Sequence, residues 1–297
     1  MPLYSSNMAE LLEPGIRTIY GTSYNDYPEE YTEVFEVDSS SKATETDFSL
    51  SGFGLVKQKA EGQPVEFDDI YKGYKTTYTH SEYALGFSVT RIMYEDDLYR
   101  QIKARPKALA RSVRHTIEIL SANILNNAFT SGTGGDGVVL CSASHPIKGG
   151  TLSNVMSPSA TFSVTSFEQA LIAIQNWTDD RGMKIRTLPK KLVVSPNDAF
   201  QAQIVLKSAK MPGTADNDVN PAMNYLPNGY TVMHWLTDTD AWFLKTDVPN
   251  GLMYFWRRRP EFTNDNEFKT EDALYKTTFR CSQGWTDWRT IYGSAGA

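Results

Sequence analysis

The stretch from residue 46 to 92 constrains the fold most, because it has the pattern of a long hairpin without the side chains to bury one. GLVKQKAEGQPVEF (54–67) predicts a strand, a reversal at its glycine and proline, and a second strand; the following residues (74–90) stay extended and β-favouring. Bulky aliphatic residues are sparse here, and no tryptophan precedes Trp177. An isolated two-stranded ribbon is marginal in water. The hairpin must therefore lie on another surface; an edge hairpin on its own domain is the alternative.

The segment 95–129, EDDLYRQIKARPKALARSVRHTIEILSANILNNAF, has the hydrophobic period of one long helix. About 35 residues at 1.5 Å each make a rod of roughly 50 Å, and its three leading acids suit a first turn. At 100° per residue the apolar side chains form one stripe, which comprises Leu98, Ile102, Leu109, Val113, Ile117, Leu120 and Ile124. The opposite face is basic and comprises Arg100, Lys103, Lys107, Arg111 and Arg114. A merely solvated face is the alternative to a binding surface.

The net charge of −6 hides an uneven distribution along the chain. Residues 1–99 carry 18 acidic and 7 basic residues, a net of −11, whereas residues 100–129 carry 6 basic residues and one acid, a net of +5. Segments of opposite charge attract one another. We therefore expect the acidic first third to be matched to basic residues elsewhere in the chain or on another subunit.

The two ends of the chain have different patterns. Residues 1–45 show no sustained helical or strand period and are predicted to form an arm. From residue 165 onward the pattern is mixed α/β: Thr165 and Glu168 have the spacing of a capping box, and KLVVSP and NDAFQAQIVLKSA predict a strand and a helix. GYTVMHWL and AWFLKT predict strands about a TDTD turn. All six tryptophans lie between 177 and 288, which places the compact core there.

No group of residues identifies an active site, and we expect neither a cofactor nor a metal. The four histidines are scattered without a second ligand at metal spacing. Cys141 and His145 are close in sequence but lack the third partner of a thiol protease. The glycine-rich run SGTGGDGVVL (131–140) follows a helix and lacks the Gly-Lys-Ser/Thr of a phosphate loop. We expect it to be the turn that ends the long helix.

Composition also disfavours a membrane-spanning protein and a dedicated nucleic-acid-binding protein. The chain has no run of about 18 apolar residues, so no bilayer span is expected. Its pI near 5.3 is unlike that of a dedicated nucleic-acid binder. The run GLMYFWRRRPEF carries Arg257, Arg258 and Arg259, whose guanidinium groups suit phosphates and carboxylates alike. We favour ion pairs between segments or subunits over phosphate contacts.

This order of parts resembles a tailed-bacteriophage major capsid protein of the Hong Kong 97-type fold, in particular the Mu-type major head subunit group. The resemblance covers nearly the whole chain. It is carried by LCSASHPIKGGTLSN, KLVVSPNDAFQAQIVLKS, TDTDAWFLKT, GLMYFWRRRPEF and FRCSQGWTDWRTIYGS. The resemblance implies an α+β fold with five parts: an N-terminal arm, an extended β-hairpin loop, a peripheral domain with the long spine helix, a mixed α/β axial domain, and returning strands of the peripheral domain. In that order they span residues 1–45, 46–92, 93–139, 140–250 and 251–297.

The same resemblance implies a non-enzymatic function and a set of partners. Copies of the chain would form hexamers and pentamers of an icosahedral shell around phage double-stranded DNA, located in the virion and assembled in the host cytoplasm. The expected partners are a portal protein, a decoration protein and packaged DNA. The chain is too short for a cleavable scaffold domain before the arm, so we also expect a separate scaffolding protein. The alternatives are a nanocompartment shell of the same fold around enzyme cargo, or an α/β hydrolase-like enzyme.

The resemblance also assigns roles to particular residues. The basic helix face would point into the lumen. Contacts between subunits are expected at Phe53, Lys57, Lys59, Arg257, Arg258 and Arg259. Some family members cross-link a loop lysine to an asparagine of a neighbour, but no acceptor motif accompanies Lys57 or Lys59. That activity is not expected here.

Overall fold

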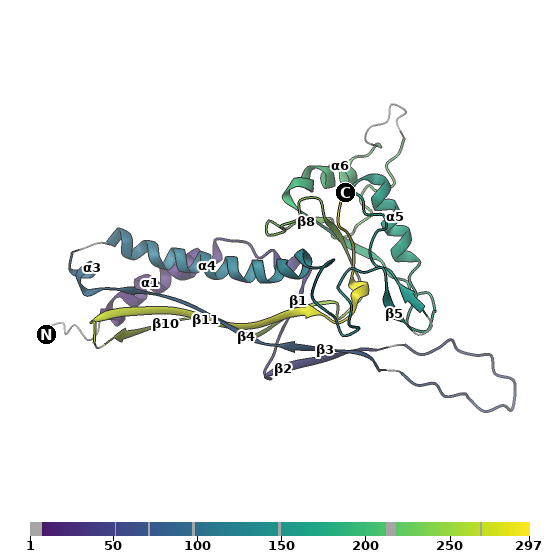
Figure 1. The fold of residues 1–297 in the computed structure, drawn as a ribbon, viewed down its shortest axis with the longest axis horizontal. Coiled ribbons are helices and arrows are strands. Elements are labelled where there is room, and N and C mark those ends of the chain that lie inside the picture. Colours follow the sequence, from purple (N-terminus) through teal and green to yellow (C-terminus); the bar gives the residue numbers. More distant parts are fainter. Residues whose placement is uncertain are drawn as a thin grey trace.

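The long helix lies along one face of a strongly elongated sheet, and a second lobe stands at the end of that sheet (Figure 1). This computed structural model describes residues 8–50, 52–70, 72–96, 99–147, 150–211, 218–267 and 269–297. Its helices and strands mix as expected for an α+β fold. None of the helices in these ranges is both long and apolar enough to cross a membrane.

The elongated first sheet has the strand order β1-β10-β11-β4. Its central pair is antiparallel and consists of two long strands, β10 (Leu252–Glu267) and β11 (Asp272–Trp285). The outer strands are β1 (Glu36–Ser39), parallel to β10, and β4 (Ser81–Val89), antiparallel to β11. Burial alternates along β11, so one face is covered by helices.

The second sheet has the order β12-β9-β7-β8 and forms the standing lobe with two helices. Its elements are α5 (Val164–Gln175), β7 (Pro189–Val194), α6 (Ala199–Lys207), β8 (Tyr230–Val232), β9 (Trp242–Thr246) and β12 (Ile291–Ser294), with one-turn helices η2 (Pro196–Asp198) and η3 (Trp288–Thr290). A small hairpin, β5 (His145–Ile147) with β6 (Gly150–Leu152), lies beside it.

The two strands predicted around the TDTD turn are present as β8 and β9, but they do not pair with each other, because β7 lies between them and pairs parallel with β8 after the crossover through α6. One expectation about this lobe is wrong. The last strand, β12, pairs with β9 in the second sheet, although we grouped it with the returning strands 251–297. The chain thus crosses from the first sheet back to the second after Trp285.

The cap of α5 also differs from the sequence prediction. The N-cap of the helix is Ser163, two residues before the predicted N-cap, Thr165. Ser163 Oγ accepts the Ser166 N–H at 3.1 Å, and the Ser163 N–H donates to Ser166 Oγ at 2.8 Å. Two serines, Ser163 and Ser166, therefore form the capping box in place of the predicted Thr165 and Glu168.

The predicted long helix is confirmed as α4 (Tyr99–Asn126), about 42 Å in length. Its stripe faces the core: Ile102, Leu109, Val113 and Ile117 are buried, and Leu120 and Ile124 are partly buried. Leu98 lies outside the described residues. Glu95 and Asp96 do not occupy the first turn of α4, because Glu95 ends a separate helix α3 (Arg91–Glu95) and Asp96 follows it. Asp97 lies outside the described residues.

The expectation of an arm without regular structure is wrong. Residues Met8–Asn25 form helix α1, which packs against α4 and β10, and Tyr31–Val34 form the short helix α2. Ile16 and Tyr20 of α1 are buried, four residues apart on one face. Its weak sequence signal has a cause, since Pro14 and two glycines lower its intrinsic helix propensity. Packing against α4 supplies the stability that propensity does not.

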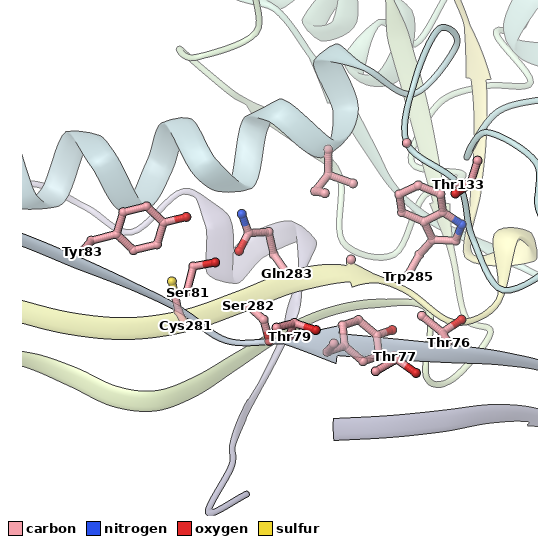
Figure 2. Close-up of a pocket in the computed structure, with 14 residues that line it drawn as sticks. Thr76, Thr77, Thr79, Ser81, Tyr83, Thr133, Cys281, Ser282, Gln283 and Trp285 are labelled. Carbon is pink, nitrogen blue, oxygen red and sulfur yellow. The ribbon is translucent and has the colours of Figure 1, made fainter. Parts of the chain in front are cut away.

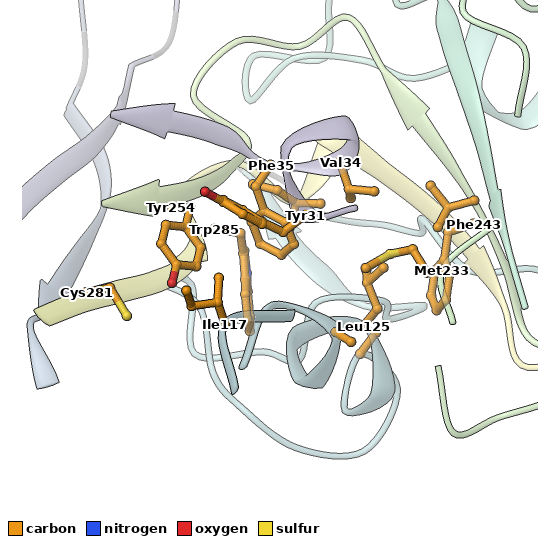
Figure 3. Close-up of a cluster of buried hydrophobic side chains, with 14 of the residues drawn as sticks. Tyr31, Val34, Phe35, Ile117, Leu125, Met233, Phe243, Tyr254, Cys281 and Trp285 are labelled. Atoms are coloured by element: carbon orange, nitrogen blue, oxygen red, sulfur yellow. The ribbon is translucent and has the colours of Figure 1, made fainter. Parts of the chain in front are cut away.

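The segment 29–34 joins α4 to both sheets. Figure 3 shows Tyr31 and Val34 of α2 beside Ile117 of α4 and Tyr254 of β10 in the main hydrophobic core. That core also includes Met233 and Phe243 of the standing lobe, so one continuous cluster joins the two sheets.

Two polar side chains of α4 hold this segment in place. Glu118 is buried, and its two carboxylate oxygens accept the backbone N–H groups of Glu30 and Tyr31 at 3.1 and 3.0 Å. Arg114 donates to Glu29 Oε1 at 2.6 Å and to the Tyr24 carbonyl at 3.3 Å, and its guanidinium lies 4.2 Å from the Tyr24 ring centroid. The otherwise unpaired N–H groups at the start of α2 are thereby satisfied.

The extended loop differs from the predicted hairpin in where it is paired. The ladder joins β2 (Thr44–Leu50) to β3 (Lys72–Thr79) at the base, whereas the described residues between them form no strand. The legs still run antiparallel, because Lys57 pairs with Glu66 at 2.6 Å and the Gln63 N–H donates to the Ala60 carbonyl at the tip. Pro64 lacks an N–H, and a lone ribbon gains little from a ladder.

We predict that Arg114→Ala lowers the free energy of unfolding of the unassembled subunit by about 2–3 kcal/mol, because it removes a buried charged donor from Glu29 and Tyr24. Urea unfolding measures this change. Lys107→Ala, on the exposed side of the same helix, is the control and should change stability by no more than about 0.5 kcal/mol. Equal effects of the two substitutions would contradict the assigned role of Arg114.

We further predict a pH dependence that originates at Glu118. Burial, and next the charge of Glu30, raise the pKa of Glu118 from 4.5 to about 7. The folded state therefore holds a proton that the unfolded state has lost, so stability falls as pH rises from 4.5 to about 7 and is unaffected by this group above that. The decrease is at most about 3 kcal/mol. Urea unfolding between pH 5 and 8 should show a shallower slope for Glu118→Gln; parallel curves would refute the assignment.

Candidate assembly surfaces

The extended loop 52–70 exposes large apolar side chains from both of its legs. Val56 is 99% exposed and Phe67 is 97% exposed. The other large apolar residues that it exposes are Phe53, Leu55, Val65 and Ile70. Exposure of this many large apolar side chains on one short segment is typical of an interaction surface. This outcome is what the sequence predicted for a hairpin that cannot bury itself.

The predicted contact residues of the loop are all solvent-accessible in the subunit. Phe53 and Lys59 are exposed, and Lys57 is exposed while pairing with Glu66 across the two legs. The Glu66 carboxylate raises the pKa of Lys57 through this hydrogen bond. Lys57 therefore forms its ion pair within the loop and not with a distant segment of the chain.

The base of the loop is bound to the standing lobe through a contact that the sequence did not reveal. Asp68 Oδ2 accepts the Gly54 N–H at 2.7 Å and Arg181 Nη1 at 2.5 Å. Hydrogen bonds from Gly54, and next from Arg181, lower the pKa of Asp68 to about 2. The carboxylate is therefore ionised across the physiological range.

Four of the five predicted basic residues of α4 form an exposed surface. Arg100, Lys103, Lys107 and Arg111 are exposed, and the Arg111 guanidinium lies 5.7 Å from the Tyr27 ring centroid. The expectation is wrong for Arg114, which is only 3% exposed. The segment after α1 covers that part of the helix, so Arg114 contacts protein within the chain and faces no lumen.

The three consecutive arginines of β10 have three different environments. Arg258 reaches across β11 to Glu82 of β4 at 2.5 Å, an ion pair between segments of one chain. The Arg259 guanidinium lies 5.9 Å from the Trp256 ring centroid. Arg257 is exposed and forms no ion pair with any described residue.

Acidic residues near α2 form contacts that the charge distribution had indicated only in general terms. Glu30 accepts the His234 backbone N–H at 2.9 Å and approaches His234 Nδ1 at 2.5 Å, and Glu33 pairs with Lys191 of β7. With Glu29 and Arg114, three acids of the acidic first third thus match basic groups of α4 and the standing lobe. Their partners are too distant in sequence for a local pattern to identify.

The Cys141 and His145 pair does not have the geometry of a nucleophile and its base. His145 does have a carboxylate partner that we missed, with Nδ1 2.6 Å from Asp136 Oδ2, but its Nε2 faces Asn154 Oδ1 at 3.1 Å. Burial raises the pKa of the Cys141 thiol, which disfavours the thiolate. His145 also stacks on Trp288 with ring centroids 4.3 Å apart. These contacts are structural.

The groove at the end of α4 is equally unlike an active site. Figure 2 shows a groove of about 250 Å³ between the end of α4 and the strands β3 and β11, and none of its 14 lining residues is charged. Hydroxyl groups such as those of Thr76, Thr79 and Ser282 supply its polar lining. Within the described ranges, no three His, Cys, Asp or Glu side chains are placed to hold a metal ion.

Comparisons with solved structures show the same fold. The structure of Microbacterium phage Oxtober96 aligns with a TM-score of 0.55 and 11% identity over 91% of this chain and 92% of that one. The capsid of bacteriophage JBD30 decorated with minor capsid protein trimers gives 0.55 and 15%, over 71% and 92%. A virus-like particle from Pyrococcus furiosus gives 0.54 and 10%, over 94% and 97%. No curated protein matches the chain.

A family model adds the function. The model described as "Phage capsid protein" matches residues 73–294, well over half of the chain. With the fold, this confirms the expected resemblance to tailed-phage capsids of the Hong Kong 97 type, while the Mu-type grouping stays a prediction. The chain therefore belongs to the phage capsid protein family and is a major capsid protein, a structural component of the icosahedral phage shell and not an enzyme.

Proposed function

We propose that copies of this chain join through the extended loop into hexamers and pentamers, which close the head around phage double-stranded DNA. The observation that carries the proposal is the exposure of Val56 and Phe67 on a loop that extends beyond the rest of the subunit (Figure 1). Burying such a side chain contributes about 1.5–3 kcal/mol. Because each copy both offers a loop and receives one, a shell repeats this contribution at every subunit.

We assign the regions of the chain on the same basis. Residues 1–45 are the arm, 46–92 the loop, and 93–139 with 251–297 the peripheral domain, apart from β12. Residues 140–250 are the axial domain, gathered around the capsomer axis. The continuous core between the two sheets supports movement of the arm, the peripheral domain and the axial domain as one body.

The basic surface of α4 is assigned to the lumen. Arg100, Lys103, Lys107 and Arg111 are exposed along one side of a helix in a chain whose net charge is −6. Such a row suits phosphates of packaged DNA, bound without sequence preference, or acidic groups of a scaffolding protein before DNA enters. We assign Arg257 and Arg259 to contacts between subunits, together with Phe53, Lys57 and Lys59.

We propose the remaining partners by analogy with other phage capsid proteins. A separate scaffolding protein, a portal protein and a decoration protein are proposed, with assembly in the host cytoplasm. The JBD30 capsid is decorated with minor capsid protein trimers, which supports the decoration proposal. A nanocompartment around enzyme cargo is disfavoured, because the matching family model describes a phage capsid protein.

We predict that Val56→Ser combined with Phe67→Ser prevents shell formation while the subunit stays folded. Both side chains are exposed in the subunit, so their loss removes contact area only between copies. Light scattering and negative-stain microscopy measure assembly, and circular dichroism verifies folding. Gln58→Ser with Gln63→Ser, polar truncations in the same loop, is the matched control and should assemble normally. Closed shells of the apolar double variant at the ordinary concentration would disprove the role of the loop.

Reversal of the charges at Lys103, Lys107 and Arg111 to Glu should reduce DNA packaging or scaffold incorporation, with the unassembled subunit still folded. The expected physical cause is lost attraction to an anionic partner, so DNA binding by the unaltered chain should weaken steeply with salt. Packaged DNA per shell and scaffold content per procapsid are the measurements. The control applies the same charge reversal to the exposed Lys207, Lys269 and Lys276. Unchanged packaging and scaffold content in the first variant would exclude the lumen assignment.

A further inference from the structure

The extended loop lies outside the hydrophobic core, so something other than core packing must set its direction. Among the described residues 52–70, the ties to the standing lobe converge on one side chain, Arg181. Its Nη1 binds Asp68 Oδ2 at 2.5 Å, and its Nη2 binds the Asp69 carbonyl at 2.6 Å. A guanidinium that uses two nitrogens on adjacent residues fixes orientation as well as distance.

The loop side of this contact also joins the two legs. Asp68 Oδ2 accepts the Gly54 N–H from the opposite leg, and Asp68 Oδ1 accepts the Asp69 N–H. Gly54 leaves little space here, since a Cβ at that position would lie 3.1 Å from Asp68 Oδ2 and 3.2 Å from Arg181 Nη1. The base of the loop, the point where both legs meet, is therefore the point that Arg181 holds.

The other side of the contact is a stiff turn. Asp179 Oδ1 accepts the N–H groups of Arg181 and Met183, both at 2.8 Å, and Gly182 has the positive φ of +80° that the turn requires. The next residue toward the N-terminus, Asp180, pairs with Arg289 of η3 at 2.7 Å. The Arg181 backbone is thus anchored to the segment that connects the first sheet to the second.

A short contact at the base has a large effect at the tip. At about 3.3 Å per residue, the eight steps from Gly54 to Gly62 span up to about 26 Å, so a tilt of about 10° at the base moves the tip by about 5 Å. Apolar side chains are in contact only within about 4–4.5 Å. A displacement of this size takes the residues of the tip out of reach of a fixed partner surface, whereas Val56 and Phe67, within two residues of the base, move by only about 1 Å and mainly change direction.

We propose that Arg181 and Asp68 form a latch that sets the direction of the extended loop in the unassembled subunit, so that the loop is oriented before it meets a second copy. This inference rests on the proposed function of the loop and identifies the residues that control it. The latch residues are positioning residues, and the apolar side chains beyond them make the contact. Preorganisation of this kind favours association because less freedom is lost on binding.

The test measures the direction of the loop without relying on assembly. Spin labels are placed on Glu61→Cys at the tip and Lys207→Cys on α6 of the full chain, held unassembled at low concentration; both native cysteines are buried. Double electron–electron resonance spectroscopy then gives the distribution of distances between the two labels. Arg181→Gln and Asp68→Asn should each widen the distribution by about twofold or more, and the double variant should widen it no further, as expected for one shared contact. Arg186→Gln, an exposed arginine in the same connection, is the matched control and should leave the width unchanged.

The same variants without labels are then assembled. A wider distribution together with slower shell formation or aberrant shells supports the latch. An unchanged width in Arg181→Gln overturns the latch, whatever happens in assembly. A wider distribution with normal shells overturns the role of the latch in assembly; if the Val56 and Phe67 double variant also assembles, the proposed function of the loop fails as well. The three results are therefore distinguishable.

Discussion

The packing of α2 against α4 and β10 is the contact on which the rest of the structure depends. Glu118 accepts the first N–H groups of α2, and this capping lets Tyr31 and Val34 enter the core without leaving buried backbone groups unpaired. The same core continues into the standing lobe through Met233 and Phe243. The two sheets are consequently joined by one continuous core, to which the arm contributes Tyr31 and Val34.

The sequence predicted α4 well because its stripe of apolar residues is a local signal with a period of 3.6. It could not predict that Arg114 is buried and Lys107 exposed, since both lie on nearly the same side of the helix. The difference comes from the segment after α1, which lies over Arg114 and Glu118 in the middle of α4 and leaves Lys107 exposed. Coverage by a remote segment has no local sequence pattern, and for that reason α1 and its contacts were missed too.

For the loop, composition predicted the exposure but not the contacts that hold it. Its reversal near Gly62 and its failure to bury itself were predictable from composition, because glycine, proline and charge replace the bulky residues of a core hairpin. The absence of a hydrogen-bonded ladder at 54–67 could not be predicted in this way, because residue preferences alone favour strands there. Arg181 and Asp68 are 113 residues apart in sequence, so no spacing links them. Their contact becomes visible only when the fold places the turn at 179–183 beside the base of the loop.

Two kinds of interaction thus stabilise different parts of this subunit. Apolar burial holds the two sheets and α4 together, and it is large enough to make them rigid. The described part of the loop (52–70) contributes no side chain to the hydrophobic clusters, and its direction depends on a few charged hydrogen bonds at its base, which are individually weak but directional. A weak joint is sufficient there, because it has only to align the loop until its apolar side chains are buried by a second copy. Strong apolar attachment of the loop to its own subunit would remove the surface that joins one subunit to the next.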